Sequence, residues 1–152
     1  MSEILCCVDF SDATDVVVRE AARIAHTADN HVHLIHVAAE EPELAGYDQG
    51  PIAAHTREDR AGELLDEHAM LRTLAERFES DETLPGLRVT PVLVMGPIVE
   101  TILTEADRLE AGTIVVGSHG HSKMHHLLLG SVSEGLIKHS RRPVVVVPVA
   151  TR

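Results

Sequence analysis

Short β-branched apolar segments alternate with segments of helical period along this chain, and this alternation restricts the possible folds more than any other feature. The apolar segments, which are typical of strands buried on both faces, are residues 4–8, 31–38, 87–95, 113–116 and 144–147. Strands that alternate with helices form a parallel sheet, with right-handed crossovers that put helices on both faces. The sequence therefore predicts an α/β fold, a doubly wound domain with a five-stranded parallel sheet.

The segments between these strands predict four helices. Ser11 or Asp12 can cap the first helix, and the third begins at Gly96 and Pro97 and ends at Gly112. The second helix is long, and its predicted apolar face consists of Ala61, Leu64, Leu65, His68, Leu71, Ala75 and Phe78.

A long loop and an edge or irregularly paired strand are predicted beside the second helix. Residues 39–55 show no sustained apolar period, which indicates a long loop before the second helix. Pro91 lacks an amide donor, so it places the third strand at an edge of the sheet or in irregular pairing.

Length and composition favour a globular chain. With 152 residues, of which 44% are hydrophobic, we expect a single domain over residues 1–152. No apolar run approaches the ~20 residues that span a bilayer, and residues 1–3 lack the basic start and long apolar run of a secretory signal. We therefore expect a cytoplasmic protein without a membrane partner. Cys6 and Cys7 are adjacent in an apolar run, which favours buried free thiols over a disulfide or a CxxC motif.

Carboxylates dominate the charge of the chain. The 24 Asp and Glu residues outnumber the 13 Lys and Arg residues, which gives a net charge of −11. Such a surface repels nucleic acids, so no nucleic-acid partner is expected. The shortage of lysine beside the excess of carboxylate is also typical of proteins that work in concentrated salt, where repulsion is screened within ~3 Å at 1 M.

The run TIVVGSHGHSKMHHLLLGSVS, residues 113–133, carries the candidate functional site. It indicates a buried strand that breaks at Gly117, a loop that contains Gly120, and a helix that follows Gly130 with Ser131 as its N-cap. The first amides of a helix have no internal partner and lie at the positive end of its dipole, so phosphate is a natural ligand there. Glycine at these positions would allow positive φ and a close approach of the backbone to the ligand.

The same residues also fit an interpretation without a ligand. Ser131-x-x-Glu134 matches a capping box, in which the two side chains satisfy the free amides at the start of the helix. The local chemistry alone leaves both interpretations open.

The spacing Gly117-x2-Gly120-x9-Gly130-Ser131 resembles the nucleotide-binding signature of the universal stress protein family. The resemblance covers the chain from VDFS at residues 8–11 to PVVVVP at residues 143–148, and the complete glycine pattern is similar to that of the ATP-binding branch. It implies a Rossmann-like nucleotide-binding α/β fold and a dimeric stress-response or regulatory module. The implied ligand is ATP, with or without Mg²⁺.

The resemblance also assigns candidate binding residues. It implies that Asp9 lies near the ribose and the metal-phosphate region, and that the backbone of Val37 meets the adenine edge. The residues implied for the ribose and phosphates are Val116, Gly117, His119 and Gly120 in the loop and Gly130, Ser131, Val132 and Ser133 at the helix start. Without the resemblance, Asp9 can also be a helix-capping acid and Val37 an ordinary core residue.

Four histidines, His119, His121, His125 and His126, lie beside Lys123 in the central run. No cysteine or carboxylate accompanies them, so the sequence predicts no metal site. We expect instead that Lys123 and partly protonated histidines reduce the repulsion between an acidic protein and a triphosphate. Nucleotide binding should then tighten at lower pH.

Motifs that would indicate a competing function, and residues that would hydrolyse a nucleotide, are missing from the sequence. It contains no GxxxxGK[ST], GxGxxG or GxSxG motif, and no catalytic triad or arginine clamp that would activate water at a γ-phosphate can be assembled. We therefore expect that the ATP binding implied by the resemblance occurs without efficient turnover, and we predict no catalytic residues. Two alternatives stay open: an interaction module that binds no nucleotide, and a slow nucleotide hydrolase.

The valine-rich last strand predicts a protein partner. An edge strand exposes unpaired amides and apolar surface, which proteins normally cover. In the universal stress protein family this strand commonly pairs with its counterpart in a second subunit, so the resemblance implies a homodimer through Val144–Val147. The alternative is a strand that is covered within the monomer.

Overall fold

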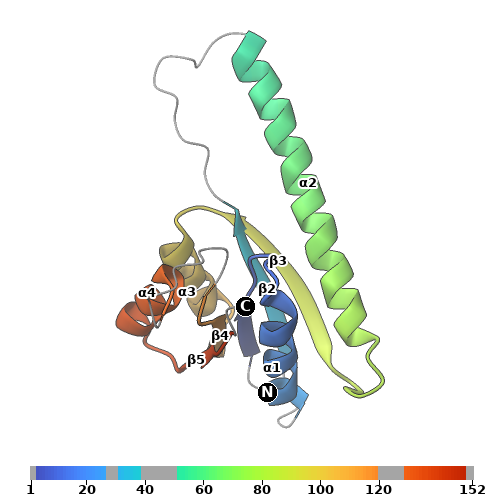
Figure 1. The fold of residues 1–152 in the computed structure, drawn as a ribbon, viewed down its shortest axis with the longest axis vertical. Helices are drawn as coiled ribbons and strands as arrows, with labels where there is room; N and C mark the ends of the chain where they lie inside the picture. Colours follow the sequence, from blue (N-terminus) through green and yellow to red (C-terminus); the bar gives the residue numbers. More distant parts are fainter. Residues whose placement is uncertain (1–2, 27–30, 39–50, 120–128, 150–152) are drawn as a thin grey trace.

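The computed structural model describes residues 3–26, 31–38, 51–119 and 129–149, with the side chains of residues 26 and 51–58 left out. Its sheet has the order β3-β2-β1-β4-β5, and every neighbouring pair is parallel (Figure 1). The strands are β1 (Glu3–Cys7), β2 (His31–Ala38), β3 (Arg88–Met95), β4 (Ala111–Gly117) and β5 (Val144–Val147). The predicted α/β fold with a five-stranded parallel sheet is confirmed.

The described residues form four helices, which cover both faces of the sheet. They are α1 (Thr14–His26), α2 (Pro51–Glu79), α3 (Ile98–Arg108) and α4 (Ser131–His139). Side chains alternate along each strand, so one core forms beneath α1 and α2 and a second beneath α3 and α4 (Figure 1). Cys6 belongs to the first core, whereas Leu5 and Ile35 belong to the second.

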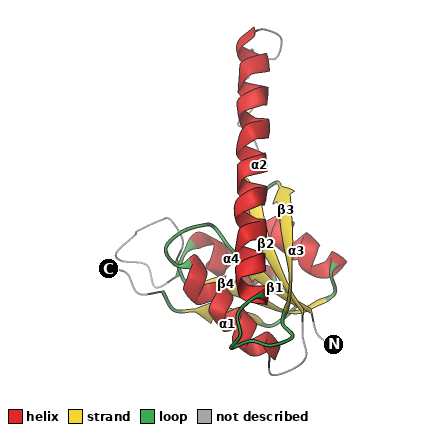
Figure 2. Cartoon of the chain, turned by 90° about the vertical axis from the view of Figure 1, so that its right-hand side faces the viewer, coloured by secondary structure: helices red, strands yellow, loops and turns green. Residues whose placement is uncertain are grey.

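Helix α2 extends well beyond the sheet (Figures 1 and 2). Its 29 residues span about 43 Å, and only the C-terminal part packs against the strands. Leu71, Ala75 and Phe78 are buried there, but Leu65 is 71% exposed and His68 is exposed. The predicted apolar face is thus wrong in its N-terminal half, because the sheet ends before the helix does. No helix in the described ranges is long and apolar enough to cross a membrane.

Two predicted boundaries are wrong. Helix α2 begins at Pro51, whose fixed φ suits the first turn of a helix, so residues 51–55 are helical and not part of a loop; residues 39–50 lie outside the described part. Helix α3 ends at Arg108, and Glu110 adopts a left-handed φ of 51°. Gly112 therefore does not end the helix but lies within β4.

The two edge predictions are confirmed. Strand β3, which contains Pro91, pairs with β2 alone, and β5 pairs with β4 alone among the described strands. The strand order reverses between β1 and β4: β2 and β3 follow on the side of β1, and β5 follows on the side of β4. In parallel α/β sheets a crevice for ligands opens beyond the carboxyl ends of the strands at such a point.

Candidate functional site

A pocket of about 670 Å³ opens at the carboxyl ends of β1, β2 and β4. Its volume lies in the range of small-molecule sites, about 300–1,000 Å³. Nine of the ten residues predicted from the sequence line it, namely Asp9, Val37, Val116, Gly117, His119, Gly130, Ser131, Val132 and Ser133. The tenth, Gly120, lies outside the described residues, as do His121, Lys123, His125 and His126.

The N-terminus of α4 borders this pocket without a side-chain cap. Gly130 is the N-cap, with φ −74° and ψ 164°, and Ser131 is the first helical residue. The capping-box interpretation is wrong, because no side chain caps the helix and the Glu134 carboxylate instead accepts a hydrogen bond from Lys138 at 2.7 Å. The first amides of α4, at the positive end of the helix dipole, are therefore not satisfied by a capping side chain.

The two serine hydroxyls at the start of α4 differ in their surroundings. Ser133 is buried, and its Oγ lies 2.9 Å from the carbonyl oxygen of Gly130 and 3.3 Å from that of Ser118. Its single proton therefore serves the protein, and no side chain caps the amides at the start of α4. The side chain of Ser131 is exposed at the pocket.

Ser118 joins three segments beneath the pocket, although the sequence did not single it out. Its carbonyl oxygen accepts a hydrogen bond from the amide of Gly130 at 2.6 Å, and its own amide donates to the carbonyl of Val147 at 2.8 Å. Its Oγ accepts a hydrogen bond from the amide of Val149 at 3.0 Å and lies 3.1 Å from Nδ1 of His119. The end of β4, the start of α4 and the chain after β5 are thus fixed to one another. The available sequence signal was a small polar residue directly after a buried strand.

The glycines at this site provide room and not an unusual backbone conformation. Neither Gly117 nor Gly130 has a positive φ, so that expectation is wrong for both. A Cβ at Gly117 would lie 3.1 Å from Cγ2 of Val17 and 3.2 Å from the carbonyl oxygen of His119. A Cβ at Gly130 would lie 3.2 Å from the carbonyl oxygen of Ser118. Both glycines therefore allow β4, α1 and the start of α4 to pack closely.

The turn between β1 and α1 forms another wall of the pocket. Oδ1 of Asp9 accepts a hydrogen bond from the amide of Ser11 at 3.0 Å, and Oγ of Ser11 accepts one from the amide of Ala13 at 3.3 Å. Phe10 has a left-handed φ of 57°, which costs a non-glycine residue about 1–2 kcal/mol. Its ring packs on that of His36 with centroids 4.5 Å apart.

Three polar residues that the sequence did not single out also line the pocket: Thr14, His36 and Glu67. The Thr14 hydroxyl is buried and has no hydrogen-bond partner in the described part of the chain. Leaving such a group unpaired costs about 1–3 kcal/mol, so a ligand that bonds it would gain affinity. Nδ1 of His36 lies 2.9 Å from the carbonyl oxygen of Val8 and carries the proton, while Nε2 lies 3.8 Å from Oε2 of Glu67.

Comparison with known sequences identifies relatives over nearly the whole chain. The profile of the universal stress protein family matches residues 1–148. Universal stress protein MJ0577 of Methanocaldococcus jannaschii is 27% identical, over 95% of this chain and 93% of its own. A universal stress protein of Mycolicibacterium smegmatis is 31% identical over 95% of this chain, which spans only 47% of that longer relative.

Solved structures show the same fold. UspA from Lactobacillus plantarum superposes with a TM-score of 0.75 at 24% identity, over 96% of this chain and 97% of its own. A universal stress protein in complex with cAMP superposes with a TM-score of 0.66 at 21% identity, over 98% of both chains. Another, from Archaeoglobus fulgidus in complex with dAMP, superposes with a TM-score of 0.60 at 19% identity, over 96% of both chains. These likenesses show the fold, and the profile match over residues 1–148 shows the family: the chain belongs to the universal stress protein family.

Proposed function

We propose that this protein is a stress-response or regulatory module that binds ATP in the pocket at the carboxyl ends of β1, β2 and β4. The observation that carries the proposal is the N-terminus of α4, which borders the pocket without a side-chain cap. The amides of Ser131, Val132 and Ser133 and the hydroxyl of Ser131 would hold phosphate oxygens. Gly117, His119 and Gly120 would lie beside the ribose and the phosphates.

The remaining walls fit the other parts of a nucleotide. Val37 is at the carboxyl end of β2, where its backbone would meet the adenine edge, and Asp9 would lie near the ribose. The relatives that were solved with cAMP and dAMP support a nucleoside phosphate as the class of ligand. The carboxylates of Asp9 and Glu67 in the lining are of the ligand type that Mg²⁺ prefers. A bound Mg²⁺ would also offset their repulsion of the phosphates.

Thermal unfolding with and without Mg-ATP tests the proposal directly. Ligand at about 100 times its dissociation constant adds roughly 2.7 kcal/mol to the free energy of unfolding. For a chain of this size the midpoint should rise by about 5–10 °C. If saturating Mg-ATP leaves the midpoint unchanged at both low and high salt, the chain is an interaction module that binds no nucleotide.

A pair of variants at Ser131 assigns the binding to the start of α4. Ser131→Pro removes one amide and one hydroxyl, yet proline suits the first position of a helix, and the extended Gly130 suits the residue before proline. Ser131→Ala keeps the amide and removes only the hydroxyl. We expect ATP affinity to fall about tenfold or more in Ser131→Pro and less in Ser131→Ala, with both folded. Equal ATP affinity in Ser131→Pro and the wild type would place the phosphates elsewhere.

We also propose that bound ATP is not turned over efficiently and that the protein works in the cytoplasm. Free thiols at Cys6 and Cys7 are compatible with a reducing compartment. Turnover is tested by phosphate release under single-turnover conditions with Mg-ATP. Release at more than a trace rate would favour the slow hydrolase.

The edge strand β5 supports a further part of this proposal, a homodimer. Strand β5 pairs with β4 on one side, and no other described strand lies on its other side. The amide of Ile114 donates to Pro143 and that of Ser118 donates to Val147. Because bonding alternates along a strand, Val144 and Val146 direct their backbone amides and carbonyls outward. A second copy of β5 would pair with these groups.

A further inference from the structure

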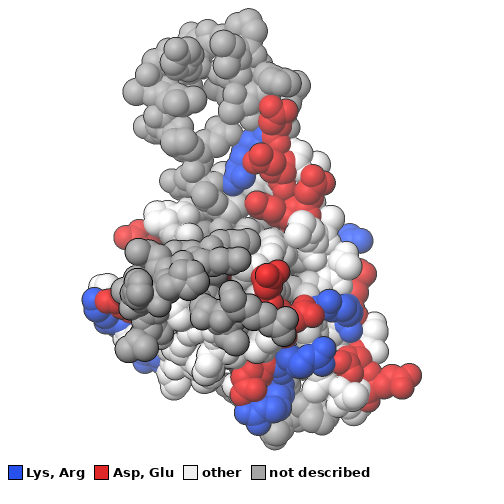
Figure 3. Space-filling model, in the orientation of Figure 1, with Lys and Arg blue, Asp and Glu red and all other residues white. Residues whose placement is uncertain are grey.

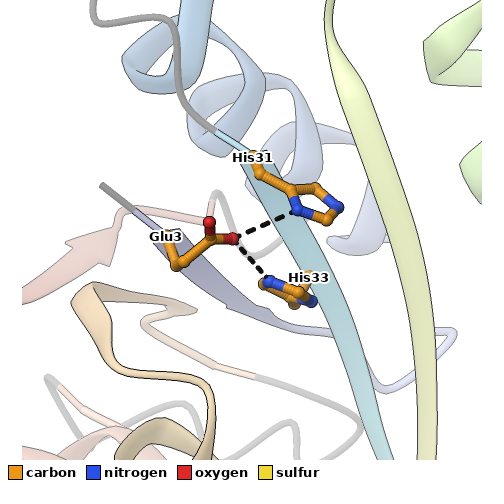
Figure 4. A group of neighbouring side chains, drawn as sticks. All are labelled: Glu3, His31 and His33. Carbon is orange, nitrogen blue, oxygen red and sulfur yellow. Dashed lines mark hydrogen bonds and ion pairs between the residues drawn. The ribbon is translucent and has the colours of Figure 1, made fainter. Parts of the chain in front are cut away.

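A second group of polar side chains lies at the amino ends of β1 and β2 (Figure 4). The pocket lies at the other end of these strands. Glu3 comes from β1 and lies directly opposite His31 of β2 in the strand register. His33 is two residues farther along β2, so it lies on the same face as His31. Three potential metal ligands therefore converge on one face of two neighbouring strands.

The distances within this cluster suit a small ion. Oε2 of Glu3 lies 2.7 Å from Nε2 of His33 and 3.1 Å from Nδ1 of His31. The potential ligand atoms all lie within 4.8 Å of one another. Around a tetrahedral ion with ligand bonds of about 2.0–2.2 Å, ligand atoms are separated by about 3.3–3.6 Å. Small side-chain rotations would therefore place all three atoms in contact with one ion.

The surroundings hold the two imidazole rings in place. Nε2 of His31 lies 2.7 Å from Oγ1 of Thr90 on β3, so Nδ1 is directed at Glu3. Histidines that bind metals commonly donate their other ring N–H to such a partner, which fixes the orientation of the ring. His33 is 7% exposed, and its packing restricts the ring. The three ligands and Thr90 belong to adjacent strands, the rigid kind of support that a metal site requires.

We propose that Glu3, His31 and His33 bind a divalent transition-metal ion, with Zn²⁺ as the representative ion and water in the remaining position. Two imidazole nitrogens and one carboxylate oxygen favour Zn²⁺, Co²⁺ or Ni²⁺ over Mg²⁺ and Ca²⁺, which prefer oxygen ligands. Two histidines with one glutamate also form a known ligand set for zinc sites that keep an open position. The site is independent of the proposed ATP binding, because it lies at the other end of the strands.

The same contacts also fit a network without a metal, in which the carboxylate of Glu3 accepts hydrogen bonds from both histidines. A Co²⁺ titration distinguishes the two cases through the visible absorption of the protein-bound ion. The titration uses the full chain with His121, His125 and His126 replaced by alanine, so that these imidazoles do not compete. In this background Glu3→Gln keeps the hydrogen-bond acceptor and removes the anionic ligand, whereas His31→Ala removes one imidazole.

His68→Ala is the matched control, because His68 is exposed on α2 and outside the cluster. We expect one Co²⁺ per chain, displaced by Zn²⁺, with an affinity that falls at least tenfold in Glu3→Gln and His31→Ala and is unchanged in His68→Ala. Thermal unfolding of each metal-free variant verifies that it is folded. Equal affinities in all variants, or no binding in the background chain, would overturn the proposal.

Anomalous diffraction provides a second measurement that depends on no variant. Crystals of the full chain grown with one equivalent of Zn²⁺ should show the ion between Glu3, His31 and His33. An ion at any other place alone would overturn the assignment.

Discussion

Cys7 lines the pocket and is half-buried, and the partial loss of water around its thiol raises the pKa to about 12. Burial also raises the pKa of the neighbouring thiol of Cys6, and the charge of Cys7 adds to this effect. Because only the thiolate is a good nucleophile, both cysteines should be unreactive in the native protein. At pH 8 a group with a pKa of about 12 is ionised in about one molecule in 10⁴.

We therefore expect Cys7 to react with a thiol reagent such as DTNB at pH 8 at least about 10³ times more slowly than free cysteine. In guanidinium chloride, which exposes both thiols, two equivalents should react rapidly. Cys7→Ser serves as the control that assigns any remaining native reactivity. Fast reaction of one equivalent in the wild type that disappears in Cys7→Ser would show that the thiol is not held in its neutral form.

At the scale of residues, the sequence predicted the positions of the pocket residues better than their structural roles. Residue type and spacing identified Gly117, Gly130 and Ser131, because each lies at a strand end or a helix start. The role of each glycine depends on distant neighbours, such as Val17 beside Gly117, which no local pattern contains. Ser118 was missed for the same reason, since its partners come from residues 130, 147 and 149.

At the scale of elements, strand β5 allows a test of the proposed homodimer. The amide of Val146 points away from β4, so Val146→Pro removes a donor that no described strand uses and that a second copy of β5 would use. Val146→Ala loses a similar amount of packing and keeps the amide. By light scattering after size-exclusion chromatography, we expect a dimer for the wild type and Val146→Ala and a monomer for Val146→Pro. A dimeric, folded Val146→Pro would show that the dimer does not form through pairing of β5.

The strands were predicted within two residues of their observed ends because burial on both faces gives continuous apolar runs. Helices were less well predicted where the deciding contact is distant. Leu65 and His68 fit the apolar face of α2, but the sheet does not extend to them. Gly112 is a typical helix terminator, yet Glu110 makes the left-handed turn and Gly112 lies within β4, where the pairing of β4 with β1 is irregular.

At the scale of the whole molecule, two electrostatic effects oppose each other. Carboxylates gather along α2, while basic side chains are spread more sparsely over the same view (Figure 3). Ion pairs such as Arg19 with Asp81 at 3.8 Å and Arg142 with Asp107 at 3.0 Å connect different elements. One side chain of each pair is exposed, and such ion pairs typically contribute about 0–1 kcal/mol each to the free energy of unfolding. Two like charges 10 Å apart in water repel by about 0.4 kcal/mol, and a net charge of −11 provides many such pairs.

We therefore expect repulsion to outweigh the ion pairs, so that raising KCl from 0.1 to 2 M stabilises the protein. Screening should add on the order of 1 kcal/mol to the free energy of unfolding, which corresponds to about 2–4 °C in the midpoint. The double variant Asp66→Lys/Glu82→Lys changes two exposed carboxylates and should show a smaller increase with KCl, because less repulsion remains to be screened. A midpoint that falls steadily with KCl in the wild type would mean that the ion pairs dominate. In that case the acidic surface would keep the protein soluble and would not make it more stable at high salt.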